Sequence, residues 1–210
     1  MEQKNRIRNI ALDMGGVVID YDSMLVIRHF VRDEAMAEKI NTALFCSYEW
    51  CLLDMGVIPE EDAFREMAAR YFTTKEEERL AKLCFDNWHL YNMFPKPGMA
   101  ELISELKQKG CRIYLFSNAS IRMCSCYKDA LPEWRDFDGI LYSAETGYIK
   151  PQKEFYEAGF RRFGIDPAES FFVDDMQRNV DGAAALGMKG YCFSDGDVEK
   201  LRKKLLEIIR

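Results

Sequence analysis

Histidine is scarce in this sequence, and its cysteines show no pairing pattern. Among 210 residues the only histidines are His29 and His89, and the seven cysteines form an odd set. Cys124 and Cys126 are separated by a single residue, which is too short a spacing for a zinc knuckle. A structural zinc site is therefore not expected, and the cysteines fit reduced thiols in a reducing compartment.

Long apolar runs and an excess of basic charge are also missing. No apolar run approaches the roughly 18 residues that span a bilayer, and the first residues lack the apolar region of a signal peptide. The net charge is −6, and the lysines and arginines are scattered along the chain. We therefore expect a cytoplasmic protein that binds neither membranes nor nucleic acid.

The composition is that of a globular protein, with 48% hydrophobic and 30% charged residues. After one apolar strand that leads to Asp13, residues 20–93 read as a block of amphipathic helices without a strand. The expected helices are 23–32, 34–44, 49–54, 60–71 and 75–89.

Strands and helices alternate in the second half of the sequence. Residues 94–98, with two prolines, read as a stiff hinge. The helices expected after it are 99–109, 121–130, 152–163, 179–186 and one starting at 198, and the strands are 111–116, 139–142, 170–175 and 191–193. Such alternation predicts an α/β fold: a doubly wound, Rossmann-like parallel sheet with an inserted all-α cap subdomain. The expected core is 1–20 with 95–210, and the expected cap is 21–94.

Four segments place chemically capable residues at strand ends or in the loops that follow. They carry Asp13, Ser117, Lys150, and the pair Asp174 and Asp175. Because the carboxyl ends of parallel strands meet at one edge of a sheet, we expect these side chains to converge there.

Taken singly, most of these residues also have a structural interpretation. Asp13 precedes two glycines and would suit a turn, Ser117 with Asn118 would suit a helix N-cap, and Lys150 before a proline would suit a solvated surface. The acidic pair has no evident packing role. The four segments together favour phosphoryl transfer.

The chemistry follows from these residue types. Carboxylates from different strands repel one another unless a cation lies between them, and oxygen ligands suit Mg²⁺. Asp13 could bind the metal with one oxygen and attack phosphorus with the other, giving an aspartyl-phosphate. Ser117, Asn118 or nearby amides could bind phosphoryl oxygens, and Lys150 could neutralise their charge.

In this order, the four segments resemble the motifs of the haloacid dehalogenase superfamily. That pattern has Asp-x-Asp-Gly after the first strand, Ser or Thr after the second, a later Lys, and an acidic pair after the next strand. The resemblance covers essentially the whole chain, with residues 20–93 in the place of the family's helical cap. It implies a nucleophile, a phosphate-binding hydroxyl, a charge-neutralising lysine and an acidic metal pair at Asp13, Ser117, Lys150, and Asp174 with Asp175.

The resemblance also implies a metal set, namely Asp13, the main-chain carbonyl of Gly15, Asp174 and Asp175. Asp175 is expected to bind Mg²⁺ directly and Asp174 through water. An acidic pair at this place favours a phosphatase over the family's dehalogenase branch. Asn179 resembles a residue that supports this loop, although N-capping of the following helix explains it equally well.

One departure from the pattern is large, because Gly15 stands where the family has its second Asp. That residue protonates the leaving group and later activates water, a contribution of about 10²–10⁴ in rate. The Asp-x-Gly-Gly form resembles a subgroup that includes bacterial sugar-1-phosphate phosphatases. Asp20 and Asp22 lie close enough in sequence to be substitutes, but they fit the cap junction better.

These observations predict a Mg²⁺-dependent phosphatase that acts on a small phosphorylated metabolite, with a sugar phosphate favoured. The alternative is a catalytically impaired relative that binds a phosphorylated ligand or a protein partner in regulation, and Gly15 is the feature that favours it. The side chains of Trp50, Trp88, His89 and Tyr91 could line a pocket near the hinge, but aromatic residues at helical spacing are more typical of the core.

Overall fold

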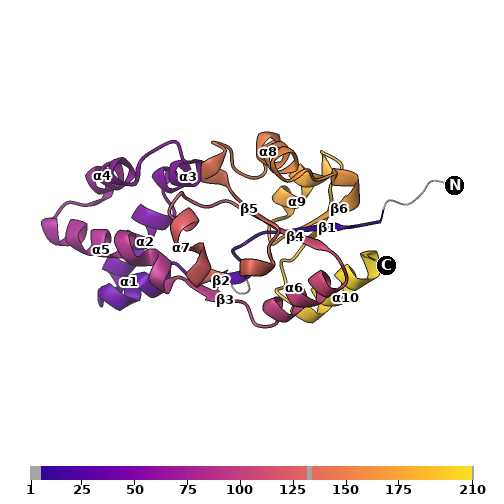
Figure 1. Ribbon diagram of the computed structural model, residues 1–210. Coiled ribbons are helices and arrows are strands. Elements are labelled where there is room, and N and C mark those ends of the chain that lie inside the picture. The colour runs from indigo at the N-terminus through magenta and orange to yellow at the C-terminus, as the bar shows by residue number, and fades with distance from the viewer. Residues whose placement is uncertain (1–5, 132–133, 210) are drawn as a thin grey trace.

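The computed structural model describes residues 6–131 and 134–209 (Figure 1). Its main sheet is parallel and has the strand order β5-β4-β1-β6-β7. The central strand β1 pairs with β4 on one side and β6 on the other. The strands are β1 (Asn9–Leu12), β4 (Arg112–Ser117), β5 (Gly139–Tyr142), β6 (Ser170–Asp174) and β7 (Lys189–Cys192). The predicted α/β fold with a parallel sheet is confirmed.

Helices cover both faces of this sheet. Successive residues of each strand point to opposite faces, so neighbouring residues of β1 pack against different helices. Leu12 belongs to a large hydrophobic cluster with residues of α6 and α10, whereas Ala11 belongs to a second cluster with residues of α8 and α9. Figure 1 shows the two helix pairs on opposite sides of the strands. The helices are α6 (Met99–Gln108), α8 (Lys153–Phe163), α9 (Gln177–Ala184) and α10 (Val198–Ile208).

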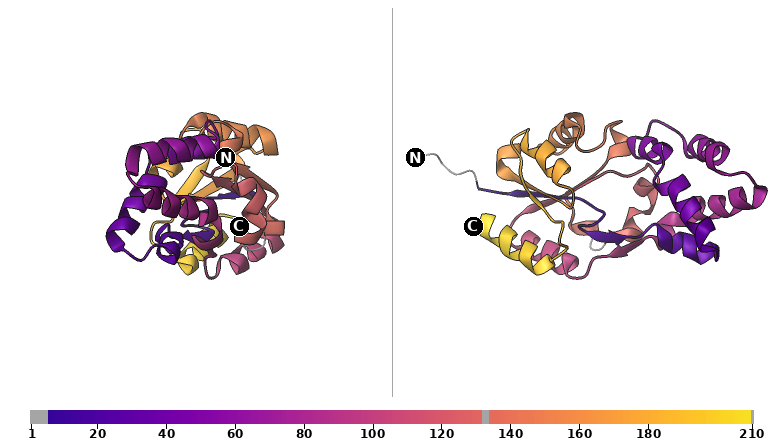
Figure 2. Two further views of the ribbon diagram at one scale, coloured as in Figure 1. Left: turned by 90° about the vertical axis from the view of Figure 1, so that its left-hand side faces the viewer. Right: turned by 180° about the vertical axis from the view of Figure 1, so that it is seen from behind.

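A block of helices lies beyond one end of the sheet, as Figure 1 and the right-hand view of Figure 2 show. It consists of α1 (Met24–Phe30), α2 (Glu34–Phe45), α3 (Tyr48–Met55), α4 (Glu60–Tyr71) and α5 (Lys75–Tyr91). Local signals define its helix starts. Pro59 precedes α4, which has three acidic residues in its first turn, and Thr74 and Glu77 form a capping box at α5.

Two short antiparallel strands connect this helical block to the sheet. They are β2 (Ile19–Tyr21) and β3 (Met93–Pro95), and Asp20 pairs with Phe94. The prediction that residues 20–93 contain no strand was therefore wrong at both ends of that range, and β3 overlaps the predicted hinge at 94–98. Strands of three residues are too short to show an alternating pattern, and Pro95 argued against a strand.

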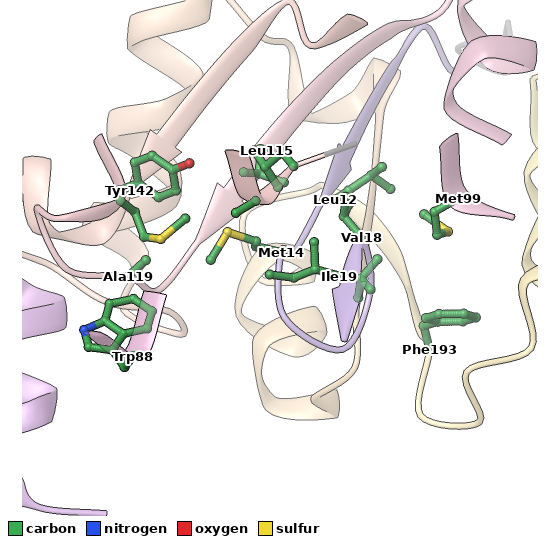
Figure 3. Packing of buried hydrophobic residues seen from close by; sticks show 14 of the residues in the cluster. Leu12, Met14, Val18, Ile19, Trp88, Met99, Leu115, Ala119, Tyr142 and Phe193 are labelled. Carbon is green, nitrogen blue, oxygen red and sulfur yellow. The ribbon is translucent and has the colours of Figure 1, made fainter. Parts of the chain in front are cut away.

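One hydrophobic cluster runs from the sheet into the helical block. Leu12, Met14 and Leu115 belong to it together with Trp88 of α5 (Figure 3). Two further elements of the core lie next to the helical block. The 3₁₀ turn η2 (Ser143–Glu145) contacts α3, and α7 (Met123–Ala130) contacts β3. In the described ranges, no helix combines the length and the apolar character that a membrane crossing requires.

Candidate active site

The turn after β1 places Asp13 at the carboxyl end of the central strand. The carbonyl of Met14 accepts hydrogen bonds from the amides of Val18 (2.9 Å) and Ile19 (3.0 Å) and so closes this turn. Gly16 has φ +73°, and a Cβ there would lie 2.7 Å from Asp175 Oδ2. Glycine at this position therefore satisfies both the backbone conformation and the close approach of Asp175.

Gly15 is under no such constraint. Its φ lies outside the left-handed region, and a Cβ built on it would meet no atom within 4 Å. The place of the absent carboxylate is therefore open space that a side chain could occupy.

Lys150 joins two of the predicted carboxylates. Its Nζ lies 2.7 Å from Asp13 Oδ1 and 2.7 Å from Asp174 Oδ2, and its side chain is 1% exposed. Burial lowers the pKa of Lys150, but the negative charges of Asp13 and Asp174 outweigh that effect and raise the pKa. The interpretation of Lys150 as a solvated surface residue is wrong.

Asp174 is held by hydrogen bonds on its other oxygen. Asn179 Nδ2 and the amide of Met176 each donate to Asp174 Oδ1 over 2.9 Å. Since Met176 is the N-cap of α9, the N-cap interpretation of Asn179 is wrong, and its amide group orients Asp174 instead. Asn179 Oδ1 is buried and has no hydrogen-bond partner among the described residues.

Ser117 is the last residue of β4, Asn118 follows it, and both border the same cavity as Asp13. Asn118 Oδ1 accepts from the amide of Lys150 (2.8 Å), and its Nδ2 donates to the carbonyl of Lys150 (3.2 Å). The side chain of Asn118 therefore positions the main chain of Lys150. The N-cap interpretation of this pair is wrong, because Arg122 is the N-cap of α7.

Three carboxylates meet at this edge of the sheet. One oxygen from each of Asp13, Asp174 and Asp175 lies within 4.8 Å of the others. Burial raises the pKa of Asp13 to about 7 against the lowering effect of Lys150, and the charge of Asp174 adds to the rise. Burial, followed by the charge of Asp174, also raises the pKa of Asp175. A hard divalent cation would offset this repulsion, and the all-oxygen donor set with the unpaired Asn179 Oδ1 fits Mg²⁺.

A cavity of about 520 Å³ opens above these groups. Its core side includes Asp13, Gly15, Ser117, Lys150 and Asp175. The helical block contributes Phe45, Trp50, Asp54 and Trp88.

The two tryptophans do more than fill the core. Their rings pack edge to face, with centroids 5.4 Å apart, and both border the cavity. Sequence reasoning did not single out Asp54. The available signal was a carboxylate between Leu53 and Met55 just before Gly56, a pattern that also fits an ordinary helix end.

Comparison with known proteins identifies the family. A family model described as haloacid dehalogenase-like hydrolase matches residues 7–187. The chain belongs to the haloacid dehalogenase-like hydrolases. This match confirms the family resemblance that the motifs indicated. It also confirms the prediction that the protein is a hydrolase.

Relatives and solved structures agree with this assignment. A sesquiterpene phosphatase of Aspergillus oryzae is 28% identical over 87% of this chain and 88% of its own length. A D-ribitol-5-phosphate phosphatase of Bacteroides thetaiotaomicron is 23% identical over 90% of this chain and 93% of its own. The structure of a predicted hydrolase of the family from Porphyromonas gingivalis superimposes with a TM-score of 0.71 at 23% identity, covering 95% of this chain and 98% of that one.

A family enzyme from Bacteroides thetaiotaomicron, solved with magnesium and inorganic phosphate, has a TM-score of 0.68 at 23% identity. The aligned region covers 88% of this chain and 93% of that enzyme's chain. At these identities the structural matches establish the fold.

Proposed function

We propose that this hydrolase is a Mg²⁺-dependent phosphatase that acts on a small phosphate monoester through an aspartyl-phosphate at Asp13. The observation that carries the proposal is the buried group in which Lys150 lies 2.7 Å from both Asp13 and Asp174, with Asp175 beside them. A lysine between two carboxylates at a sheet edge suits the charge of a phosphoryl group and its nucleophile.

Each residue has a distinct part in this reaction. One oxygen of Asp13 attacks phosphorus, and the P–O bond to the alcohol breaks. The Ser117 hydroxyl and the main-chain amide of Asn118 bind phosphoryl oxygens, and Lys150 offsets negative charge as it moves from the ester to the leaving oxygen. When bound, Mg²⁺ supplies positive charge to the phosphoryl group. Asp13, Asp174, Asp175 and the carbonyl of Gly15 would hold it.

The helical block, residues 21–94, is proposed as a cap over the core formed by 1–20 and 95–210. It covers the carboxyl ends of the strands and supplies one wall of the cavity. A cap of this kind excludes water from the phosphoenzyme and selects the alcohol part of the substrate.

The Asp-x-Gly-Gly form of the segment that begins at Asp13 favours a sugar phosphate as the substrate. The aromatic side chains of Phe45, Trp50 and Trp88 suit the apolar face of a sugar ring and also a larger apolar alcohol. The two phosphatase relatives, named for ribitol 5-phosphate and for sesquiterpenes, span these two classes. A panel of sugar phosphates, polyol phosphates and isoprenoid monophosphates would rank them.

Phosphate release from an aryl phosphate, with and without Mg²⁺, tests the proposal. We expect release that requires Mg²⁺ and that disappears in Asp13→Asn, because an amide does not form the phosphoenzyme. Wild-type protein that binds phosphate but releases none from any ester would instead favour the regulatory binding alternative.

A further inference from the structure

The reaction proposed above needs a proton for the departing oxygen. Asp13 and Asp175, which border the cavity from the core, already serve as nucleophile and metal ligand in that reaction. Gly15 has no side chain where the family's acid stands. Lys150 is the only ammonium group bordering the cavity among the described residues, and it is engaged by Asp13 and Asp174. An alkoxide would leave poorly without a donor.

Asp20 and Asp22, the two candidates nearest in sequence, are engaged by other groups, although Asp20 also borders the cavity. The carboxylate of Asp20 forms an ion pair with Lys96, next to the strand pair that joins the two units. Asp22 Oδ1 accepts from the amide of Met24 at the start of α1 (2.8 Å). Both belong to the cap junction, as their place in the sequence suggested.

Asp54 is a further carboxylate that borders the cavity, and it comes from the helical block. Its main chain is fixed to the core, because the Ser143 hydroxyl of η2 donates to the Asp54 carbonyl. Two residues later, Gly56 ends α3 so close to the core that a Cβ on it would lie 2.2 Å from the carbonyl oxygen of Ala144. The end of α3 is thus held in direct contact with η2 of the core.

The side chain of Asp54 is directed toward the loop that carries Ser117. The backbone of Ser120, three residues after the predicted phosphate-binding hydroxyl, lies close enough to the Asp54 carboxylate to lower its pKa, and Ser120 borders the same cavity. Asp54 and Ser117 therefore border one cavity, Asp54 from the helical block and Ser117 from the core.

The surroundings of Asp54 keep a proton on it near neutral pH. Burial raises the pKa of Asp54 to about 7, and the nearby backbone of Ser120 offsets that rise only in part. A general acid is most effective when its pKa lies near the working pH.

Few ionisable groups face Asp54 from the elements packed around it. Cys51 of α3 and Tyr21 of β2 are close enough to feel its charge. The other acids of α3 and η2 are paired, Glu49 with Arg70 and Glu145 with Arg162. Cys46, at the end of α2, borders the same cavity.

We propose that Asp54 is the acid–base residue of this phosphatase, in place of the carboxylate missing at position 15. The inference rests on the proposed function. In the first step Asp13 attacks phosphorus, the ester P–O bond breaks, and the Asp54 carboxyl gives its proton to the departing oxygen. In the second step water attacks the phosphoryl group, its proton passes to the Asp54 carboxylate, and the bond between phosphorus and Asp13 breaks. Alcohol and inorganic phosphate leave, and both aspartates return to their starting states.

The test compares Asp54→Asn with Asp62→Asn, a control that removes an exposed carboxylate of the same helical block, on α4. Both variants and the wild type are assayed with a series of phosphate monoesters whose leaving groups range from p-nitrophenol to a primary alcohol. A general acid matters most for the poorest leaving group.

We expect Asp54→Asn to lower kcat by about 10²–10⁴ with the alkyl phosphate and by less than about threefold with p-nitrophenyl phosphate. The fall in wild-type rate above about pH 7 with the alkyl ester should also disappear. Asp62→Asn should match the wild type throughout.

Two results would overturn the assignment. An equal loss for all leaving groups would make Asp54 a structural or substrate-binding residue, and no loss would remove it from the reaction. Both leave the phosphatase function intact, whereas a wild type inactive on every ester would overturn the function and the assignment together.

Discussion

Asp174 and Asp175 are neighbours in the sequence, but the two carboxylates have different contacts. Both oxygens of Asp174 are engaged, one by Lys150 and the other by Asn179 and the Met176 amide. Asp175 borders the cavity and lies against Gly16. Asp174 thus holds neighbouring groups of the site in place, and Asp175 is the carboxylate that we propose binds the cation directly.

The two alanine variants should therefore fail in different ways. Asp174→Ala leaves Lys150 with one buried partner and should lower the free energy of unfolding by about 3 kcal/mol. Asp175→Ala should cost less than about 1 kcal/mol but weaken Mg²⁺ binding by about 100-fold, more than Asp174→Ala does. Urea unfolding and calorimetric Mg²⁺ titration separate the two effects. The reverse order of Mg²⁺ affinities would exchange the roles.

The raised pKa of Asp54 also predicts a pH-dependent stability. Its pKa of about 7 in the folded protein exceeds the ordinary 3.8, so the folded state binds more protons between these values. The stability that wild-type protein owes to this group is fully present below about pH 4 and is lost as the pH rises to about 7. Asp54→Asn removes the buried charge.

Relative to the wild type, Asp54→Asn should therefore gain about 2–4 kcal/mol in the free energy of unfolding between pH 4 and pH 8. Denaturant unfolding at several pH values without Mg²⁺ measures this gain, with Asp62→Asn as the control. A difference that does not change with pH would mean that Asp54 is not protonated in the folded state.

Among the elements, α3 connects the proposed cap to the chemistry. Gly56 and Gly110 both have left-handed φ, +68° and +82°, but only the Cβ of an alanine at 56 would collide with backbone. Each Gly→Ala change should cost about 1 kcal/mol through φ alone. Gly56→Ala should cost at least about 1 kcal/mol more, and it should reduce turnover of alkyl phosphates because Asp54 moves with the end of α3.

Thermal unfolding and assays of the two variants check this prediction. Gly110→Ala should keep full activity. If Gly56→Ala matched it in both stability and turnover, the contact with Ala144 would have no part in placing Asp54.

Sequence signals predicted elements well where those signals are local. The bounds of α4 were predicted as observed, because Pro59 and the acidic first turn mark its start. The start of α7 was placed two residues early, at 121 rather than at Met123, since no capping residue marks it. The β2 and β3 strands were missed because each pairs only with the other, over 70 residues away, and their three residues show no pattern of their own.

At the scale of the whole molecule, Arg122 fastens the two units together. It follows β4 in the core and forms two bonds of 2.7 Å with the carboxylate of Glu60 on α4. Its remaining nitrogen donates to the carbonyl of Asp86 on α5 over 2.8 Å. A single core side chain thus holds two helices of the proposed cap.

Arg122→Ala should loosen the cap and raise KM by about 3- to 10-fold. Limited proteolysis should then cut faster near the strands that join the units. Arg202→Ala removes a comparable ion pair with Glu105 inside the core and should leave KM unchanged. Equal effects of the two variants on KM and on proteolysis would show that the contact does not govern closure.

The same scale explains which part of the site could be predicted. Asp13, Ser117, Asp174 and Asp175 lie at strand ends, Lys150 lies in the loop between η2 and α8, and the sheet topology brings these segments together. Asp54 depends on a contact between α3 and a loop more than 60 residues later. No periodicity or spacing encodes how the helical block sits on the core, so its contribution emerged only from the structure.

The most direct test of the account is to trap the phosphoenzyme. The protein is mixed with Mg²⁺ and an aryl phosphate, quenched in acid during turnover, digested and examined by mass spectrometry. The account predicts one phosphoryl group, carried by Asp13, and neither phosphoryl group nor turnover in Asp13→Asn. A phosphoryl group on another residue, or phosphate release by Asp13→Asn at more than a few per cent of the wild-type rate, would contradict it.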